Sequence, residues 1–134
     1  MDAALSRLVW QRARRCCEYC RMPQDYDDSP FEVDHIVSRK HGGPTVANNL
    51  AWSCYQCNSR KGSDIAGRDA KTRRLVPLFN PRRHKWERHF RWKGARLIGR
   101  SGIGRVTIAI LDINDPLRVE LREELMDEGR FPPQ

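Results

Sequence analysis

Residues 54–62 read CYQCNSRKG, and the pair Cys54 and Cys57 runs directly into a polar stretch typical of a short helix. Two residues between thiols allow both sulfur atoms to turn toward one ion. A second pair with the same spacing, Cys17 and Cys20, lies upstream, with 33 residues between the two pairs. Four thiolates complete a tetrahedral site, so these cysteines are predicted to hold one structural Zn²⁺.

The number of cysteines and the absence of a membrane span predict where in the cell the protein is located. The chain has 134 residues and five cysteines, no run apolar enough to span a membrane, and no signal-peptide core. We therefore expect a cytoplasmic, reducing location, where cysteines serve metal binding or catalysis rather than disulfides. One CxxC pair is also typical of a redox site, but two pairs without a βαβ pattern argue against that alternative. Cys16 is left over and is expected to stay reduced and unbound.

The segment between the cysteine pairs is too long for a compact zinc ribbon and must fold on its own. It contains FEVDHIV, residues 31–37, a short β-branched strand with Asp34 and His35 side by side in its middle. A buried carboxylate needs a partner. Neighbours on a strand point to opposite faces, so both side chains can lean toward the following helix only if the strand ends there. The glycine turn a few residues later makes such an ending plausible.

Two asparagines extend this candidate site. Asn58 follows the zinc cysteine Cys57, so metal binding would fix its position. The oxygens of Asp34 and Asn58 are hard ligands that suit Mg²⁺ or Mn²⁺, and a neutral His35 beside them can take a proton from water. Asn49 is expected to hold the intervening loop or the histidine. Taken singly, each residue has a simpler explanation as a structural histidine or as a turn or helix cap.

The order of these features is more specific than any one of them. CEYC (17–20), VDHIV (33–37), HGG (41–43), NL (49–50) and CYQCNSRKG (54–62) together resemble the motif of the HNH endonuclease family, of the zinc-stapled ββα-metal kind. The resemblance covers about residues 16–62. It continues more loosely into FNPRRHKWERHFRW (79–92).

The resemblance implies a role for each site residue. Asp34 and Asn58 would be ligands of a catalytic Mg²⁺ or Mn²⁺, His35 the general base, and Asn49 the residue that orients the histidine and its loop. The final motif position is Asn58 rather than histidine, which makes the chain an HNN variant and weakens the case for softer ions there. The implied products carry 5′-phosphate and 3′-hydroxyl ends. His41 is expected to cap its loop rather than to approach the phosphate.

The charge is concentrated after the motif. The net charge is +8, and residues 68–105 carry 13 basic and only two acidic residues. Such a block is a plausible contact surface for double-stranded DNA, although a solvated basic face explains the charge equally well. Within RRHKWERHFRWK (82–93), Trp86 and Phe90 are four apart and are predicted to face the core. The predicted phosphate contacts are Arg60, Lys61, Arg82, Arg83, Lys85 and Arg88.

The expected architecture is α+β. A ββα-metal core with its zinc knuckles is assigned to residues 1–75, including a helix over 2–15. Residues 76–134 form a basic segment, a hairpin over 90–101 and helices over 103–113 and 116–126, packed on the core. Residues 64–74 are expected to be helical or irregular.

The predicted function is a metal-dependent DNA endonuclease or nickase with low sequence specificity, since no separate reader module is visible. The main alternative is a non-catalytic zinc module that binds nucleic acid, and the next is a zinc-stabilised protein-interaction domain. The sequence leaves open cutting of one strand or two, and a monomer or a homodimer.

Overall fold

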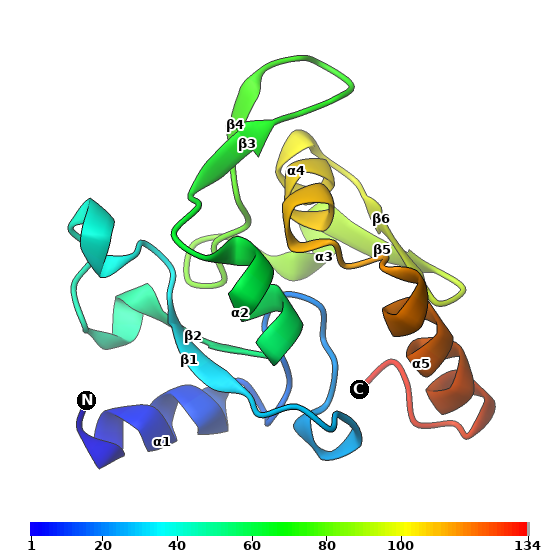
Figure 1. Ribbon diagram of the computed structural model, residues 1–134, viewed down its shortest axis with the longest axis horizontal. Helices are drawn as coiled ribbons and strands as arrows, with labels where there is room; N and C mark the ends of the chain where they lie inside the picture. Colours follow the sequence, from blue (N-terminus) through cyan, green and yellow to red (C-terminus); the bar gives the residue numbers. More distant parts are fainter. Residues whose placement is uncertain (134) are drawn as a thin grey trace.

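The computed structural model describes residues 1–133. Helices are mixed with three separate two-stranded antiparallel sheets, which confirms the α+β class (Figure 1). Three short 3₁₀ turns, Gln24–Tyr26, Arg39–His41 and Ala47–Asn49, lie in the N-terminal half. No helix in the described part of the chain is both long and apolar enough to cross a membrane.

The centre of the N-terminal half is a ββα unit. Strand β1 (Glu32–His35) pairs with β2 (Leu50–Ser53), and helix α2 (Tyr55–Lys61) follows at once. The Cys54 sulfur caps this helix by accepting a hydrogen bond from the Cys57 amide at 3.4 Å. The helix ends at Lys61 because the next residue is a glycine with a φ of 52°, a conformation that other residues rarely adopt. The second cysteine pair therefore also sets the start of α2.

Helix α1 (Ala3–Arg12) covers one side of this unit. Asp2 accepts a hydrogen bond from the amide of Leu5 at 3.1 Å, as an N-cap does. The predicted helix over residues 2–15 is too long, because Arg14 and Arg15 have φ angles of 54° and 60° that end it. This left-handed turn leads the chain into the first cysteine pair.

The segment after α2 corrects the sequence-based expectation. Residues 64–74 are neither helical nor irregular throughout, because β3 (Ala66–Arg68) and β4 (Leu75–Pro77) form an antiparallel hairpin. The hairpin packs on helix α4 (Gly102–Leu111) through Gly67, where an added Cβ would lie 2.4 Å from the Ile110 side chain. The absence of a side chain at Gly67 allows this close approach.

The C-terminal half follows the prediction more closely. Helix α3 (Trp86–His89) leads into a hairpin of β5 (Phe90–Lys93) and β6 (Arg96–Gly99), which confirms the hairpin expected over 90–101. Trp86 and Phe90 are buried, as their spacing predicts. Helix α5 (Pro116–Asp127) begins after Asp115, whose side chain accepts from the Leu117 amide at 3.0 Å.

One hydrophobic cluster joins the two halves. It runs from the four cysteines of the two CxxC pairs through Phe79, Trp86 and Phe90 to apolar residues of α4 and α5. Arg122 of α5 is fully buried and donates hydrogen bonds to the carbonyls of Ala95 and Ile113. The acidic C-terminal helix thus packs on the rest of the protein through a buried cation.

Candidate functional site

The four cysteines of the two CxxC pairs come together. Their sulfur atoms all lie within 4.8 Å of one another, and all four residues are buried. Cys16 is outside this cluster. Arg118 of α5 approaches with Nη2 3.7 Å from the Cys54 sulfur, and Nη1 donates to Asp27 at 3.0 Å. Four buried thiols beside a guanidinium are the donors and the compensating charge expected for a tetrahedral Zn²⁺, so the residues fit that ion.

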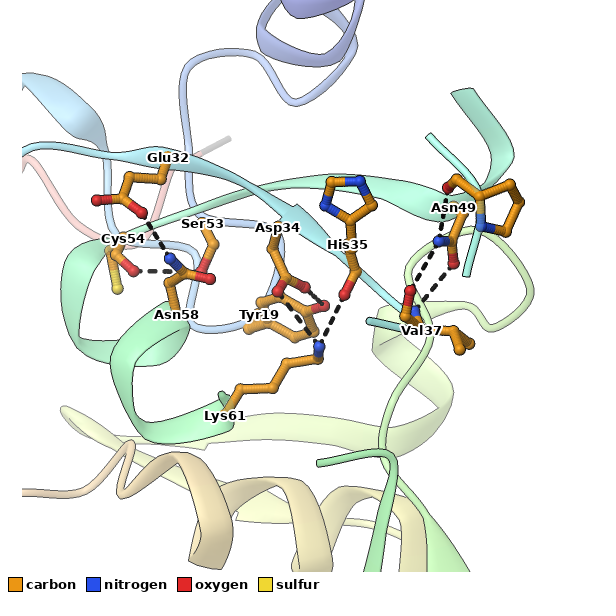
Figure 2. Close-up of polar contacts among 11 residues, drawn as sticks. Tyr19, Glu32, Asp34, His35, Val37, Asn49, Ser53, Cys54, Asn58 and Lys61 are labelled. Atoms are coloured by element: carbon orange, nitrogen blue, oxygen red, sulfur yellow. Dashed lines mark hydrogen bonds and ion pairs between the residues drawn. The ribbon is translucent and has the colours of Figure 1, made fainter. Parts of the chain in front are cut away.

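Asp34 faces α2, and its partner is Lys61. The carboxylate is buried, and it accepts one hydrogen bond from the Tyr19 hydroxyl at 2.6 Å and another from Lys61 Nζ at 3.2 Å (Figure 2). Burial raises the pKa of Asp34, and the ammonium and hydroxyl groups oppose that rise. Lys61 is itself only 2% exposed, so its ammonium group does not face solvent as a phosphate contact would. The position of Lys61 corrects that expectation.

Asn58 lies one turn before Lys61 on α2, and a different carboxylate holds it. Its Nδ2 donates to Glu32 Oε2 at 2.8 Å. Glu32 and Asp34 lie on the same face of β1, because they are two residues apart on the strand. Among residues 1–133, Asp34 and Asn58 share no hydrogen bond, and the two pairs lie next to each other along the strand (Figure 2). The Glu32–Asn58 hydrogen bond orients the Asn58 amide and makes Glu32 a site residue that the sequence analysis missed.

The His35 ring lies on the other side of β1. Figure 2 shows it pointing away from α2, as strand alternation requires. The expectation that both side chains lean toward α2 is therefore wrong for His35, because the strand continues through this residue and is still paired with Leu50. Its Nε2 is 2.9 Å from the hydroxyl oxygen of Thr45, a residue of the loop after the double glycine that the sequence analysis did not single out. The His35 carbonyl oxygen accepts a hydrogen bond from Lys61 Nζ at 3.1 Å. Lys61 therefore contacts both residues of the Asp-His pair, although their side chains diverge.

Asn49 connects the two ends of the loop between β1 and β2. Its Oδ1 accepts from the Val37 amide, and its Nδ2 donates to the carbonyls of Val37 and Pro44, each at 2.9 Å. The loop also needs Gly43, because a Cβ there would lie 1.7 Å from the Val37 carbonyl oxygen. These contacts fix the path of the chain immediately after His35.

The predicted phosphate contacts fall into different environments. Arg82 is ion-paired with Glu18 and donates to the Leu50 carbonyl, and its side chain is only 15% exposed, so it joins segments of the fold. Arg60 Nη2 lies 3.7 Å from Oδ2 of Asp112, at the end of α4, and about half of the Arg60 side chain is exposed. The remaining three are exposed and form no ion pair within residues 1–133: Arg83, Lys85 and Arg88.

Two antiparallel strands followed by a helix, with a four-cysteine cluster that can hold a metal at the helix start, define a ββα domain. Residues 17–64 match the family described as HNH endonuclease, so the chain carries a domain of this family. This match confirms the resemblance seen in the sequence. The comparisons with curated proteins and with solved structures gave no match.

Proposed function

We propose that the chain is a metal-dependent DNA endonuclease or nickase that hydrolyses phosphodiester bonds to 5′-phosphate and 3′-hydroxyl ends. The observation that carries this proposal is the Asp34 carboxylate at the end of β1, which faces the helix that bears Asn58, with His35 next to it in the strand, within an HNH domain. The HNH match supports a nucleic-acid-related activity for these residues, and the reaction and the metal are inferred from their chemistry.

The donors present fit a hard divalent cation. Asp34 supplies a buried carboxylate whose oxygens each keep an unused lone pair beside the contacts from Tyr19 and Lys61. Asn58 uses its amide nitrogen on Glu32, which leaves its Oδ1 as the atom for a cation. Mg²⁺ and Mn²⁺ accept such oxygen ligands together with several waters. When bound, such an ion would polarise the phosphate and neutralise charge on the departing 3′-oxygen.

His35 then acts as the general base. When Nε2–H donates to the Thr45 hydroxyl, the Nδ1 lone pair is left to take a proton from the attacking water. Lys61 fixes the Asp34 carboxylate and the His35 backbone, and Asn49 holds the chain that follows. Each catalytic group is thus held by a second residue.

The exposed cations account for DNA binding. Arg83, Lys85, Arg88 and the half-exposed Arg60 are available for phosphate contacts, which neutralise charge without reading bases. Double-stranded DNA is therefore the proposed substrate, and low sequence specificity is expected.

The test is cleavage of supercoiled plasmid by zinc-loaded protein with Mg²⁺ or Mn²⁺. Omitting the divalent cation serves as the metal control, because EDTA would compete for the zinc. His35→Ala should abolish nicking, and His41→Ala, at an exposed histidine of the same loop, should leave most of it. If wild type and His35→Ala bind DNA equally and neither cuts it, the protein is a non-catalytic zinc module that binds nucleic acid.

A further inference from the structure

The β3–β4 hairpin, residues 66–77, is a strongly basic projection. Its loop extends beyond the body of the protein, past α4 (Figure 1). It carries four exposed cations that form no ion pair within residues 1–133: Arg68, Lys71, Arg73 and Arg74. Its one acidic residue is Asp69, so these cations dominate the charge at the tip.

Asp69 does not offset these cations, because its carboxylate is turned inward. Arg105 of α4 binds it with two hydrogen bonds, each 2.9 Å, and holds the pKa of Asp69 well below its usual range. The same carboxylate accepts from the Thr72 hydroxyl at 2.9 Å and from the Lys71 amide at 3.3 Å. Asp69 thus shapes the tip while its charge is matched by a residue outside the hairpin.

The hairpin is held in a fixed position. A short two-stranded ladder is marginally stable alone, but here one face packs on α4 through Gly67. Two backbone hydrogen bonds close the tip. The Arg73 amide donates to the Asp69 carbonyl at 2.7 Å, and the Asp69 amide donates to the Arg74 carbonyl at 2.9 Å. Arg68 pairs with Leu75, so both side chains lie on the outer face. The cationic side chains are therefore attached to an ordered backbone, which lowers the entropic cost of binding a ligand.

The base of the hairpin borders the end of β1. A cavity of about 200 Å³ is lined both by residues that follow β1 or end α2, namely Ile36, Val37 and Lys61, and by residues that flank or end the hairpin or lie beyond it, among them Ile65, Pro77 and Arg83. A three-residue strand extends about 10 Å, a length close to the ~12 Å width of a DNA major groove.

We propose that the β3–β4 hairpin binds the phosphate backbone of duplex DNA across the groove from the bond being cut. The inference rests on the proposed function, because it takes the end of β1 as the cutting site. The hairpin exposes four cations and only one large apolar side chain, that of Leu75, so its surface suits a polyanion rather than an apolar partner. A regular row of phosphates matches such a spread of charge.

The test is the salt dependence of DNA binding, measured by fluorescence anisotropy with a labelled duplex. All proteins carry His35→Ala, are zinc-loaded and are kept without other divalent cations, so that nothing is cut. The hairpin variant is Lys71→Gln/Arg73→Gln/Arg74→Gln. Its matched control removes three exposed cations from the tip region of the β5–β6 hairpin, namely Arg91→Gln/Lys93→Gln/Arg96→Gln.

The slope of log K against log salt is negative, and each lost phosphate contact should reduce its magnitude by about 0.9. The hairpin variant is therefore expected to lose roughly 2–3 in slope, and roughly 100-fold or more in affinity at about 0.1 M salt. The control should lose less than about 1 in slope. A charge-keeping variant, Arg73→Lys/Arg74→Lys, should retain the wild-type slope, because a phosphate contact of this kind needs only charge.

Equal slopes for the hairpin and control variants would overturn the inference, and so would a complete absence of DNA binding. The proposed function is judged separately, by plasmid cleavage with the wild-type protein. Cleavage together with equal slopes refutes the role of the hairpin alone. Hairpin-dependent binding without cleavage refutes the nuclease proposal and leaves the hairpin as a DNA contact.

Discussion

Replacing Lys61 with methionine should destabilise the protein more than any exposed lysine substitution does. Lys61 and Asp34 are both buried, with side chains 1% and 4% exposed, and their charged atoms are 3.2 Å apart. Methionine preserves the volume of the side chain but leaves the carboxylate without its cation and the His35 carbonyl without its donor. The substitution therefore tests the ion pair rather than the packing.

The expected cost follows from the burial. Removing one partner of a buried ion pair costs about 3–5 kcal/mol. Tyr19 still donates to Asp34 in the variant, so the lower part of this range, about 3 kcal/mol, is expected. That is a large share of the roughly 5–15 kcal/mol that stabilises an ordinary domain.

The assay is urea unfolding of zinc-saturated protein, followed by circular dichroism without other divalent cations. Lys71→Met, at an exposed lysine, is the matched control and should change stability by no more than about 0.5 kcal/mol. Asp34→Asn combined with Lys61→Met removes both charges, and should recover about 2 kcal/mol relative to the sum of the single variants. A cost below about 1 kcal/mol for Lys61→Met, or strictly additive effects, would refute the reasoning.

The same variant also reports on the proposed catalytic ion. The ammonium group of Lys61 repels a divalent cation from Asp34, so its removal should strengthen cation binding there. Adding Mg²⁺ is therefore expected to raise the melting temperature of Lys61→Met more than that of wild type. If Asp34→Asn/Lys61→Met showed the same Mg²⁺ response as Lys61→Met, Asp34 would not be a ligand.

Three further outcomes are expected. Gly43→Ala should cost about 1–3 kcal/mol and reduce plasmid nicking, because its Cβ would overlap the Val37 carbonyl; unchanged unfolding and nicking would contradict this. Cys57→Ser should lower bound zinc from about one ion per chain, by elemental analysis, and unfold the ββα unit; a folded, zinc-free variant would show that the cluster is not structural. Burial lowers the pKa of both His84 and His89, so the stability they contribute is complete above about pH 6.5 and is lost as pH falls through their folded-state pKa values. His89→Gln should flatten the fall in urea midpoint from about pH 7 to 5, and NMR titration of either imidazole above about 6.5 would contradict the sign.

The sequence predicts those parts of the fold that depend on local signals. The cysteine spacing predicts the four-cysteine cluster, and the helices expected from residue 2 and from residue 116 begin there, each capped by an aspartate, Asp2 and Asp115. The four-residue spacing of Trp86 and Phe90 predicts their burial. In each case, residues close together in the chain carry enough information, because a cap or a knuckle involves only a few neighbouring residues.

The parts that the sequence does not predict depend on distant partners. Lys61 stands in a polar, basic run and resembles a surface lysine, and only its contact with Asp34, 27 residues upstream, makes it a buried one. Arg82 is similar, since its partner Glu18 is 64 residues away. The β3–β4 hairpin lacks alternating apolar residues, and it forms because Gly67 and Arg105 attach it to α4. Tertiary packing outweighs local preference at these positions.

Helix α2 is held at both ends, and this arrangement links the zinc cluster to the candidate active site. Cys54 and Cys57 fix its first turn, while Lys61 joins its last turn to Asp34 and to the backbone of His35. Asn58 lies between these two attachments, and four residues of helix span only about 6 Å. A shift of the cysteine cluster would therefore move Asn58 relative to β1. Zinc loss is accordingly expected to abolish the proposed hydrolysis, although zinc has no role in the proposed chemistry, whereas Lys61→Met should keep its zinc and alter the response to Mg²⁺.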